Sequence, residues 1–169
     1  RALHAQSIIL GCSGKGVVRN FNDPNNRSDK PYSYYYERLF GDDSDQKWDF
    51  TSWIPDLVVI CLGTNDFSTY PHPDEAVFME NYHKLLDQII TNYPSAKISC
   101  VSTTDEKVKR LVKEVVEKEN NSLNHPQVFE ASYPPYVENT GCDWHPSMAD
   151  NVAIASSIID TIMVKLSWD

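Results

Sequence analysis

The sequence has little that would break or cross-link a chain. Glycine supplies 6 of its 169 residues, and its 4 cysteines, Cys12, Cys61, Cys100 and Cys142, include no close pair of the kind that builds a zinc site. This spacing predicts no metal site and leaves disulfide pairing open. The chain also has no uninterrupted run of about eighteen apolar residues and no charged-then-apolar leader at its start. We therefore expect neither a membrane span nor a signal peptide in it.

Basic residues are also scarce. The chain has 15 Lys and Arg against 24 Asp and Glu, which gives a formal net charge of −9 at pH 7. The one local basic cluster, Lys107–Arg110, alternates with an apolar position as the solvated face of a helix does. Composition therefore argues against a nucleic-acid partner. The length predicts a single domain over residues 1–169 with one substantial core.

Segments with the apolar pattern of a strand alternate along the chain with segments that have the apolar spacing of a helix. Short apolar runs bounded by turn residues predict strands at Gln6–Leu10, Leu57–Leu62, Lys97–Val101 and Gln127–Glu130. Helical spacing predicts a short helix at Tyr32–Phe40 and longer helices that begin near Pro73, Thr103 and Ser147. Thr103 and Ser147 each stand three residues before an acidic residue, as in a capping box. This alternation predicts an α/β fold in which helices cover both faces of a parallel sheet.

The stretch Pro55–Ser68 is the most informative part of the sequence. Residues 57–62 resemble a strand buried on both faces of a parallel sheet, and Gly63-Thr64-Asn65-Asp66 follows at its carboxyl end. Ligands bind at this edge in open α/β sheets. A side-chain amide there, such as that of Asn65, can donate a hydrogen bond to an oxygen that becomes negative during acyl transfer. Residues of these types are also common in turns for conformational reasons, so the four alone leave both interpretations open.

Two further stretches extend this pattern. Gly141-Cys142-Asp143-Trp144-His145-Pro146 precedes the last predicted helix, and Ser13-Gly14-Lys15-Gly16-Val17-Val18-Arg19-Asn20 follows the first predicted strand. Together with Gly63–Asp66 they resemble blocks of the SGNH, or GDSL-like, hydrolase superfamily. The similarity is greatest to carbohydrate esterase family 2, whose members resemble deacetylases of plant polysaccharides. The resemblance covers almost the whole chain.

The resemblance implies a fold and a site. The fold would be the SGNH hydrolase fold, a flavodoxin-like three-layer α/β/α sandwich. His145 matches the catalytic base, Asn65 matches the oxyanion-hole asparagine, and Gly14 matches the glycine whose backbone N–H joins it. No cofactor is implied, and the substrate would be an acetylated carbohydrate. Three more residues are expected at the substrate, and the last of them is also expected to brace its loop: Trp144, Tyr136 and Asp66.

The sequence departs from the family pattern at two points. The superfamily commonly places an aspartate three residues before its histidine, and that position here is Cys142; Asp143 is one residue too close, so the orienting role is not carried over to it. The Gly-Asp-Ser block that carries the nucleophile is not found in this chain, and Ser13 lies where the family uses glycine and backbone.

The absent block has a structural consequence. In the flavodoxin-like strand order, the strand that precedes it would lie between Gln6–Leu10 and Leu57–Leu62. Without that strand, buried backbone groups would be left unpaired. We therefore expect another segment, from a longer precursor or a partner chain, to fill the slot.

The leading hypothesis is a carbohydrate esterase domain that deacetylates polysaccharide or oligosaccharide by Ser-His acyl transfer, with its nucleophile serine outside this chain. An extracellular location is implied by resemblance. The alternative is a non-catalytic domain of the same fold that serves carbohydrate binding or structural assembly. A nucleotide-binding domain shares the sheet, but the glycines of Gly11–Gly16 fit neither a Walker loop nor a dinucleotide fingerprint.

Overall fold

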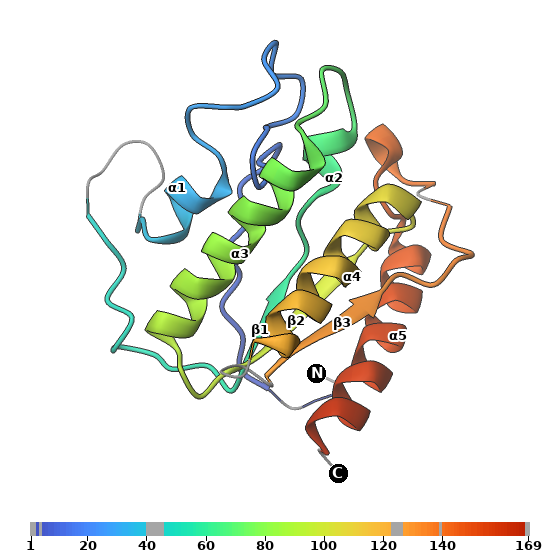
Figure 1. Cartoon of the computed structure of the whole chain (residues 1–169). Helices are drawn as coiled ribbons and strands as arrows, with labels where there is room; N and C mark the ends of the chain where they lie inside the picture. The colour runs from blue at the N-terminus through green and yellow to red at the C-terminus, as the bar shows by residue number, and fades with distance from the viewer. Residues whose placement is uncertain (1–2, 4, 40–45, 123–126, 139, 168–169) are drawn as a thin grey trace.

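A computed structural model of the chain describes residues 3, 5–39, 46–122, 127–138 and 140–167. Within this part of the chain the strands β1 (Leu57–Ile60), β2 (Lys97–Ser102) and β3 (Val128–Ser132) form a parallel sheet in the order β1-β2-β3 (Figure 1). The helices are α1 (Tyr32–Tyr36), α2 (Thr64–Phe67), α3 (Glu75–Asn92), α4 (Glu106–Asn121) and α5 (Met148–Leu166). The predicted α/β fold with a parallel sheet is confirmed.

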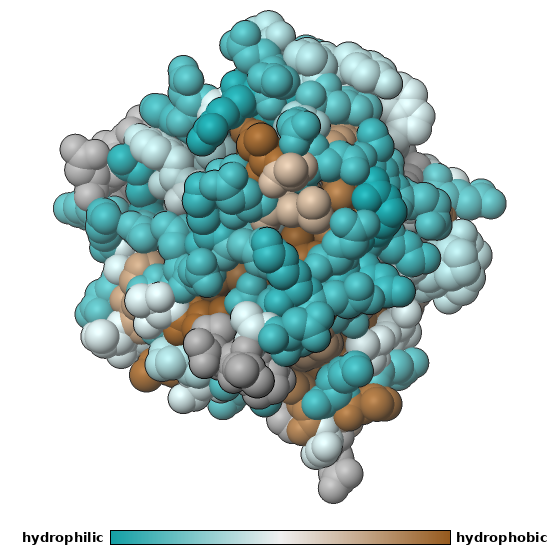
Figure 2. Space-filling model, in the orientation of Figure 1, coloured by the Kyte–Doolittle hydropathy of each residue, from teal (hydrophilic) through white to brown (hydrophobic). Residues whose placement is uncertain are grey.

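Helices cover both faces of the sheet. Ile98, Cys100 and Val128 point to one face, where they join the apolar stripes of α3 and α4 in one buried cluster. Val101 and Ala131 alternate with these residues along β2 and β3, so they point to the opposite face, against which α5 packs. The outer sides of α3 and α4 are solvated, and Figure 2 shows this face of the molecule to be mainly hydrophilic.

An aspartate carboxylate caps the amino terminus of each of the two long helices, α3 and α4, on the first face. Asp74 Oδ1 accepts hydrogen bonds from the backbone N–H groups of Ala76 and Val77, so α3 begins after Pro73 and Asp74. The Asp105 carboxylate caps α4 through the Val108 N–H at 2.9 Å. The predicted cap at Thr103 is therefore wrong, because Asp105 stands nearer the first turn.

Two other helix predictions have different outcomes. The predicted capping box of Ser147 with Asp150 is confirmed at the start of α5. The helix expected over Tyr32–Phe40 is shorter than predicted: α1 ends at Tyr36, and Phe40 lies outside the described residues.

The amino-terminal segment does not form the strand predicted at Gln6–Leu10. Ile8, Ile9 and Leu10 are exposed, and β1 pairs only with β2 among the described residues. The sequence has the apolar pattern of a strand, but a strand forms only where a neighbour accepts its hydrogen bonds. In the described part of the chain no strand lies along the outer edge of β1, and Val59 in the middle of that strand is 50% exposed.

Helix α5 is also only partly covered. Ile154 and Ile162 are buried, but a neighbouring apolar stripe at helical spacing is exposed at Met148, Val152 and Ala155 and half-buried at Ile159, Met163 and Leu166. By length and composition alone, the segment Cys142–Leu166 would pass as a membrane span, because an 18-residue window within it has a mean hydropathy of 1.2. Burial of Ile154 and Ile162 gives α5 a place in the domain, and the absence of a membrane span stays a prediction.

We predict that Gly63 tolerates no side chain. Its φ of 119° suits glycine, and an added Cβ would lie 2.9 Å from Val108 Cγ1 of α4. Gly63→Ala should lower the free energy of unfolding by about 2 kcal/mol, because backbone strain and overpacking add. Gly11→Ala is the matched control, since an added Cβ there meets nothing within 4 Å. Equal denaturation midpoints for the two variants in urea would contradict this account.

Candidate active site

A buried carboxylate supports the loop that follows the amino-terminal segment. Asp66 in α2 is fully buried, and its two oxygens accept hydrogen bonds from the backbone N–H groups of Val17 at 2.9 Å, Val18 at 2.7 Å and Arg19 at 2.9 Å. Burial raises the pKa of the Asp66 carboxyl, and these hydrogen bonds act in the opposite direction. Asp66 was expected both at the substrate and as a brace of its loop, and the contacts that the structure shows are those of a brace beneath the loop of Val17–Arg19.

Glycine at position 16 makes this close approach feasible. A Cβ added to Gly16 would lie 2.6 Å from Asp66 Oδ2 and 2.0 Å from the Arg19 carbonyl oxygen. No side chain fits in that space. The loop can therefore wrap around the carboxylate only with glycine at this position.

The Arg19 side chain joins this loop to the loop that follows α2. Arg19 is fully buried, and its guanidinium donates to the carbonyl oxygens of Asn25 at 2.9 Å, Thr69 at 2.8 Å and Tyr70 at 3.1 Å. It also donates to the carbonyl oxygen of Asp23. Arginine suits this position because its planar head carries several donors in fixed directions. The sequence alone did not single out Arg19.

The Asn65 amide and the Gly14 backbone lie next to each other on this support. Asn65 Nδ2 donates to the carbonyl oxygen of Lys15 at 2.8 Å, and Lys15 follows Gly14 in the chain. A side-chain amide has two hydrogens, so this contact leaves one for a ligand. Gly14 has a φ of 74°, and its N–H donates to no other described residue. The hydrogen bond thus ties the Asn65 amide to the residue that follows Gly14, and both groups are neutral donors of the kind that an oxyanion hole uses.

His145 lies in the turn before α5 with its imidazole exposed. Its Nδ1 is 3.2 Å from the carbonyl oxygen of Cys142. A carbonyl oxygen only accepts hydrogen bonds, so in the neutral ring this contact places the proton on Nδ1 and leaves the Nε2 lone pair free. That tautomer can act as a general base. No hydrogen bond joins the Asp143 carboxylate to His145 in the described part of the chain, so the backbone carbonyl holds the orienting position.

The turn before His145 exposes a large aromatic side chain. Asp143 and Trp144 have φ values of 50° and 57°, in the left-handed region that non-glycine residues seldom adopt. Trp144 is 88% exposed. Tyr136, in the turn after β3, is exposed as well. Strained backbone is commonly retained where it holds a functional group in place.

These elements gather at the carboxyl edge of the sheet. α2 follows β1 directly, and the turn with His145 lies on the connection from β3 to α5. Figure 1 shows α2 and the turn before α5 at the same end of the molecule. The structure therefore places Gly14, Asn65 and His145 at one end of the fold.

Cys61 and Tyr133, which the sequence did not connect, meet at this edge. Cys61 Sγ lies 3.5 Å from the Tyr133 hydroxyl, across the end of β2. Although Cys61 is exposed as a residue, desolvation of its sulfur raises the pKa of the thiol, and burial raises the pKa of the Tyr133 hydroxyl.

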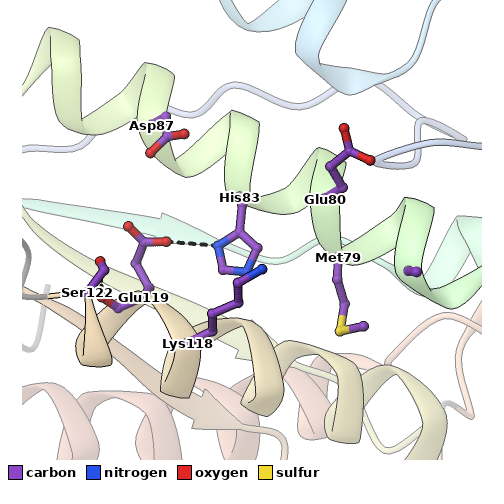
Figure 3. Close-up of a pocket in the computed structure, with 8 residues that line it drawn as sticks. Met79, Glu80, His83, Asp87, Lys118, Glu119 and Ser122 are labelled. Carbon is purple, nitrogen blue, oxygen red and sulfur yellow. Dashed lines mark hydrogen bonds and ion pairs between the residues drawn. The ribbon is translucent and has the colours of Figure 1, made fainter.

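Two hollows in the described surface lie away from these residues. One, of about 540 Å³, lies between α3 and α4, where His83 Nδ1 is 2.8 Å from Glu119 Oε2 (Figure 3). Another is lined by Ile54, Ser95 and Leu166 among others. In the part of the chain that the structure describes, no group of His, Cys, Asp and Glu side chains suits a metal ion.

Comparison with known proteins gives the class. The model of the GDSL-like lipase/acylhydrolase family matches residues 1–149, and the chain belongs to this family. The chain is 33% identical to the cellulase/esterase CelE of Acetivibrio thermocellus, in a match that covers 99% of this chain and 21% of the length of that relative. It is 27% identical to an acetylxylan esterase / glucomannan deacetylase of Cellvibrio japonicus, over 99% of the chain and 47% of the relative.

A solved structure shows which family of the SGNH superfamily the chain is close to. The fold matches that of a family two carbohydrate esterase from Clostridium thermocellum in complex with cellohexaose, with a TM-score of 0.74 and 32% identity, over 93% of this chain and 49% of that one. Within the SGNH superfamily the chain is thus close to carbohydrate esterase family 2, as its sequence predicted. It spans about half or less of the length of these relatives.

We predict that removal of the Asp66 carboxylate weakens the whole site. Asp66→Ala would leave three buried N–H groups unpaired, at a cost of about 1–3 kcal/mol each. The free energy of unfolding should fall by about 3 kcal/mol or more. Asp29→Ala removes an exposed carboxylate from the same amino-terminal part of the chain and should change it by less than about 0.5 kcal/mol. Similar urea denaturation midpoints for the two variants would contradict the bracing role.

Proposed function

We propose that this domain removes acetyl groups from a polysaccharide or oligosaccharide by Ser-His acyl transfer, and that the nucleophile serine lies outside this chain. The observation that carries the proposal is the arrangement of the Gly14 N–H, the Asn65 amide and the free Nε2 of His145 at one edge of the sheet. The names of the family 2 relatives support an acetylated carbohydrate as the substrate. A polymeric substrate fits a site of action outside the cell.

The chemistry follows from these groups. The serine hydroxyl attacks the acetyl carbonyl carbon while His145 Nε2 takes its proton. The carbonyl oxygen becomes negative and accepts hydrogen bonds from the Gly14 N–H and the Asn65 amide. His145 then gives the proton to the departing sugar oxygen, which leaves an acetyl-serine. Water, deprotonated by the same nitrogen, attacks this ester; His145 returns that proton to the serine oxygen as acetic acid leaves, and the acid then ionises to acetate in solution.

The Cys142 carbonyl has a defined part in this reaction. It accepts a hydrogen bond from the Nδ1–H group of His145, and its partial negative charge stabilises the imidazolium that forms at each proton transfer. A carbonyl does this less strongly than the carboxylate of a Ser-His-Asp triad. The site would therefore operate as a dyad, with Trp144 and Tyr136 beside it as flat apolar surfaces for sugar rings.

A segment that carries the serine has a place to bind along the open outer edge of β1. This edge has no strand neighbour among the described residues, and Val59 and the stretch Ile8–Leu10 are exposed. The exposed apolar stripe of α5 is a further uncovered surface of the fold. A parallel strand paired with β1 would end at the same edge of the sheet as Asn65, and a residue just after it would face the two donors. We propose that a segment outside this chain, from a longer precursor or a partner chain, binds there.

A second function has its own support. Trp144 is exposed in a left-handed turn, and no carboxylate orients His145 among the described residues. These features also suit a domain of the same fold that binds carbohydrate without cleaving it. Such a domain would bind deacetylated polymer and hydrolyse no acetyl ester.

The first test of the catalytic role is substitution in the full-length protein. His145→Ala should lower kcat for an acetyl ester by at least about 1000-fold, and Asn65→Ala by about 100-fold or more. Asn26→Ala, at an exposed loop position, is the control and should leave kcat unchanged. Full activity of His145→Ala would end the Ser-His mechanism. Binding of polymer without hydrolysis by the unaltered protein would favour the second function.

The second test concerns the open edge of β1. If a segment covers it in the full-length protein, Val59→Lys buries a charge and should lower the free energy of unfolding by about 2 kcal/mol or more. Val164→Lys on α5 is the control, because Val164 is also exposed and lysine favours helices. A Val59→Lys protein as stable as this control would show that no segment covers the Val59 side chain in the full-length protein.

A further inference from the structure

Tyr70, in the loop between α2 and α3, is exposed but firmly held. Its side chain is 83% exposed. Its ring nevertheless stacks on the imidazole of His72, with the ring centres 4.1 Å apart and the planes 9° from parallel. One face of the phenol ring is thus covered by His72, and the opposite face is available to a ligand.

The stack continues into the core. The His72 ring meets the edge of Phe67 at 5.7 Å, and Phe67 in turn meets Phe78 of α3 at 5.1 Å. Phe67 and Phe78 are buried. His72 is therefore supported from beneath, and the exposed ring of Tyr70 is the outer end of an aromatic column that starts in the hydrophobic core.

The backbone of the loop is fixed independently. Arg19 Nη2 donates to the Tyr70 carbonyl oxygen at 3.1 Å, and Arg19 Nη1 donates to the Thr69 carbonyl oxygen at 2.8 Å. The Asn22 N–H donates to Thr69 Oγ1 at 3.2 Å. Because Arg19 is fully buried, these contacts are shielded from water and hold Tyr70 at a set position relative to the loop of Gly14.

The position of Tyr70 connects it with the candidate site. It lies five residues after Asn65, in the loop that leaves α2 at the carboxyl edge of the sheet. Figure 1 shows this loop at the same end of the molecule as α2. A substrate longer than one sugar would extend across this edge.

A held aromatic ring is suited to a sugar ring. The C–H face of a pyranose packs on a flat aromatic surface, and a side chain already held in one orientation loses little conformational entropy on binding. An exposed tyrosine is not unusual in itself. What distinguishes Tyr70 is that both its ring and its backbone are fixed by buried groups, although the outer face of the ring contacts no other aromatic ring in the described part of the chain.

We propose that Tyr70 is a stacking platform for a sugar ring of the polymeric substrate, beyond the sugar that carries the scissile acetyl group. This inference rests on the proposed function, since it identifies part of the substrate of the same site. His72 is a positioning residue, which supports the platform without contacting the sugar.

The test uses full-length protein and separates binding from catalysis. Affinity for deacetylated glucomannan is measured by titration calorimetry, and KM and kcat are measured with acetylated glucomannan and with 4-nitrophenyl acetate. Tyr70→Ala should weaken binding and raise KM for the polymer about fivefold or more, because a stacking contact is worth about 1 kcal/mol. Tyr70→Phe should stay within about twofold, and His72→Ala should fall between them. KM and kcat for the small ester should stay unchanged in all three.

One control variant and two contrary results complete this test. Ile54→Ala removes an exposed apolar side chain next to the opposite end of β1 and should leave polymer affinity unchanged. Polymer affinity within twofold of the unaltered protein in Tyr70→Ala would overturn the platform, even if acetyl esters are hydrolysed. If Tyr70→Ala weakens polymer binding as expected but the unaltered protein hydrolyses no acetyl ester, the proposed function is refuted and the platform stands.

Discussion

The site depends on a buried carboxylate, that of Asp66, which has no cationic side chain as its partner among the described residues. Asp66 accepts three backbone N–H groups from one short loop, and the same loop carries Gly14 and the contact to Asn65. The cost of burying the charge raises its pKa, and the N–H groups offset part of this cost. The neighbouring cation, Arg19, uses its own buried charge on carbonyl oxygens of two other segments. Two buried charges thus fix three loops without forming an ion pair.

This arrangement suits a site that must stabilise a developing negative charge. The charges of Asp66 and Arg19 are committed to backbone groups beneath the surface, and the groups that face the candidate ligand position are neutral donors. A neutral oxyanion hole releases its product anion more easily than a cation would. Acetate would leave such a site without having to break an ion pair.

The sequence predicted the repeated units of the fold well. Apolar runs located β1, β2 and β3, and helical spacing located α3, α4 and α5, because these signals come from residues close together in the chain. The strand expected at Gln6–Leu10 did not form, since an apolar pattern indicates burial but cannot supply a neighbour. The start of α4 was misplaced by two residues because Thr103 and Asp105 both suit a cap, and only the geometry selects between them. The roles of Arg19 and His72 depend on contacts between distant segments and leave no local signal.

The aromatic column beneath Tyr70 links the interior of the domain to its rim. Phe67 belongs to α2, the same turn that presents Asn65, and it packs on Phe78 of α3. A change of shape at Phe78 would therefore be transmitted both to the amide donor and to the exposed ring. Under the proposed function, this column ties residues of the hydrophobic core to substrate preference, and substitutions made for stability in α3 are expected to alter which polymers the surface accommodates.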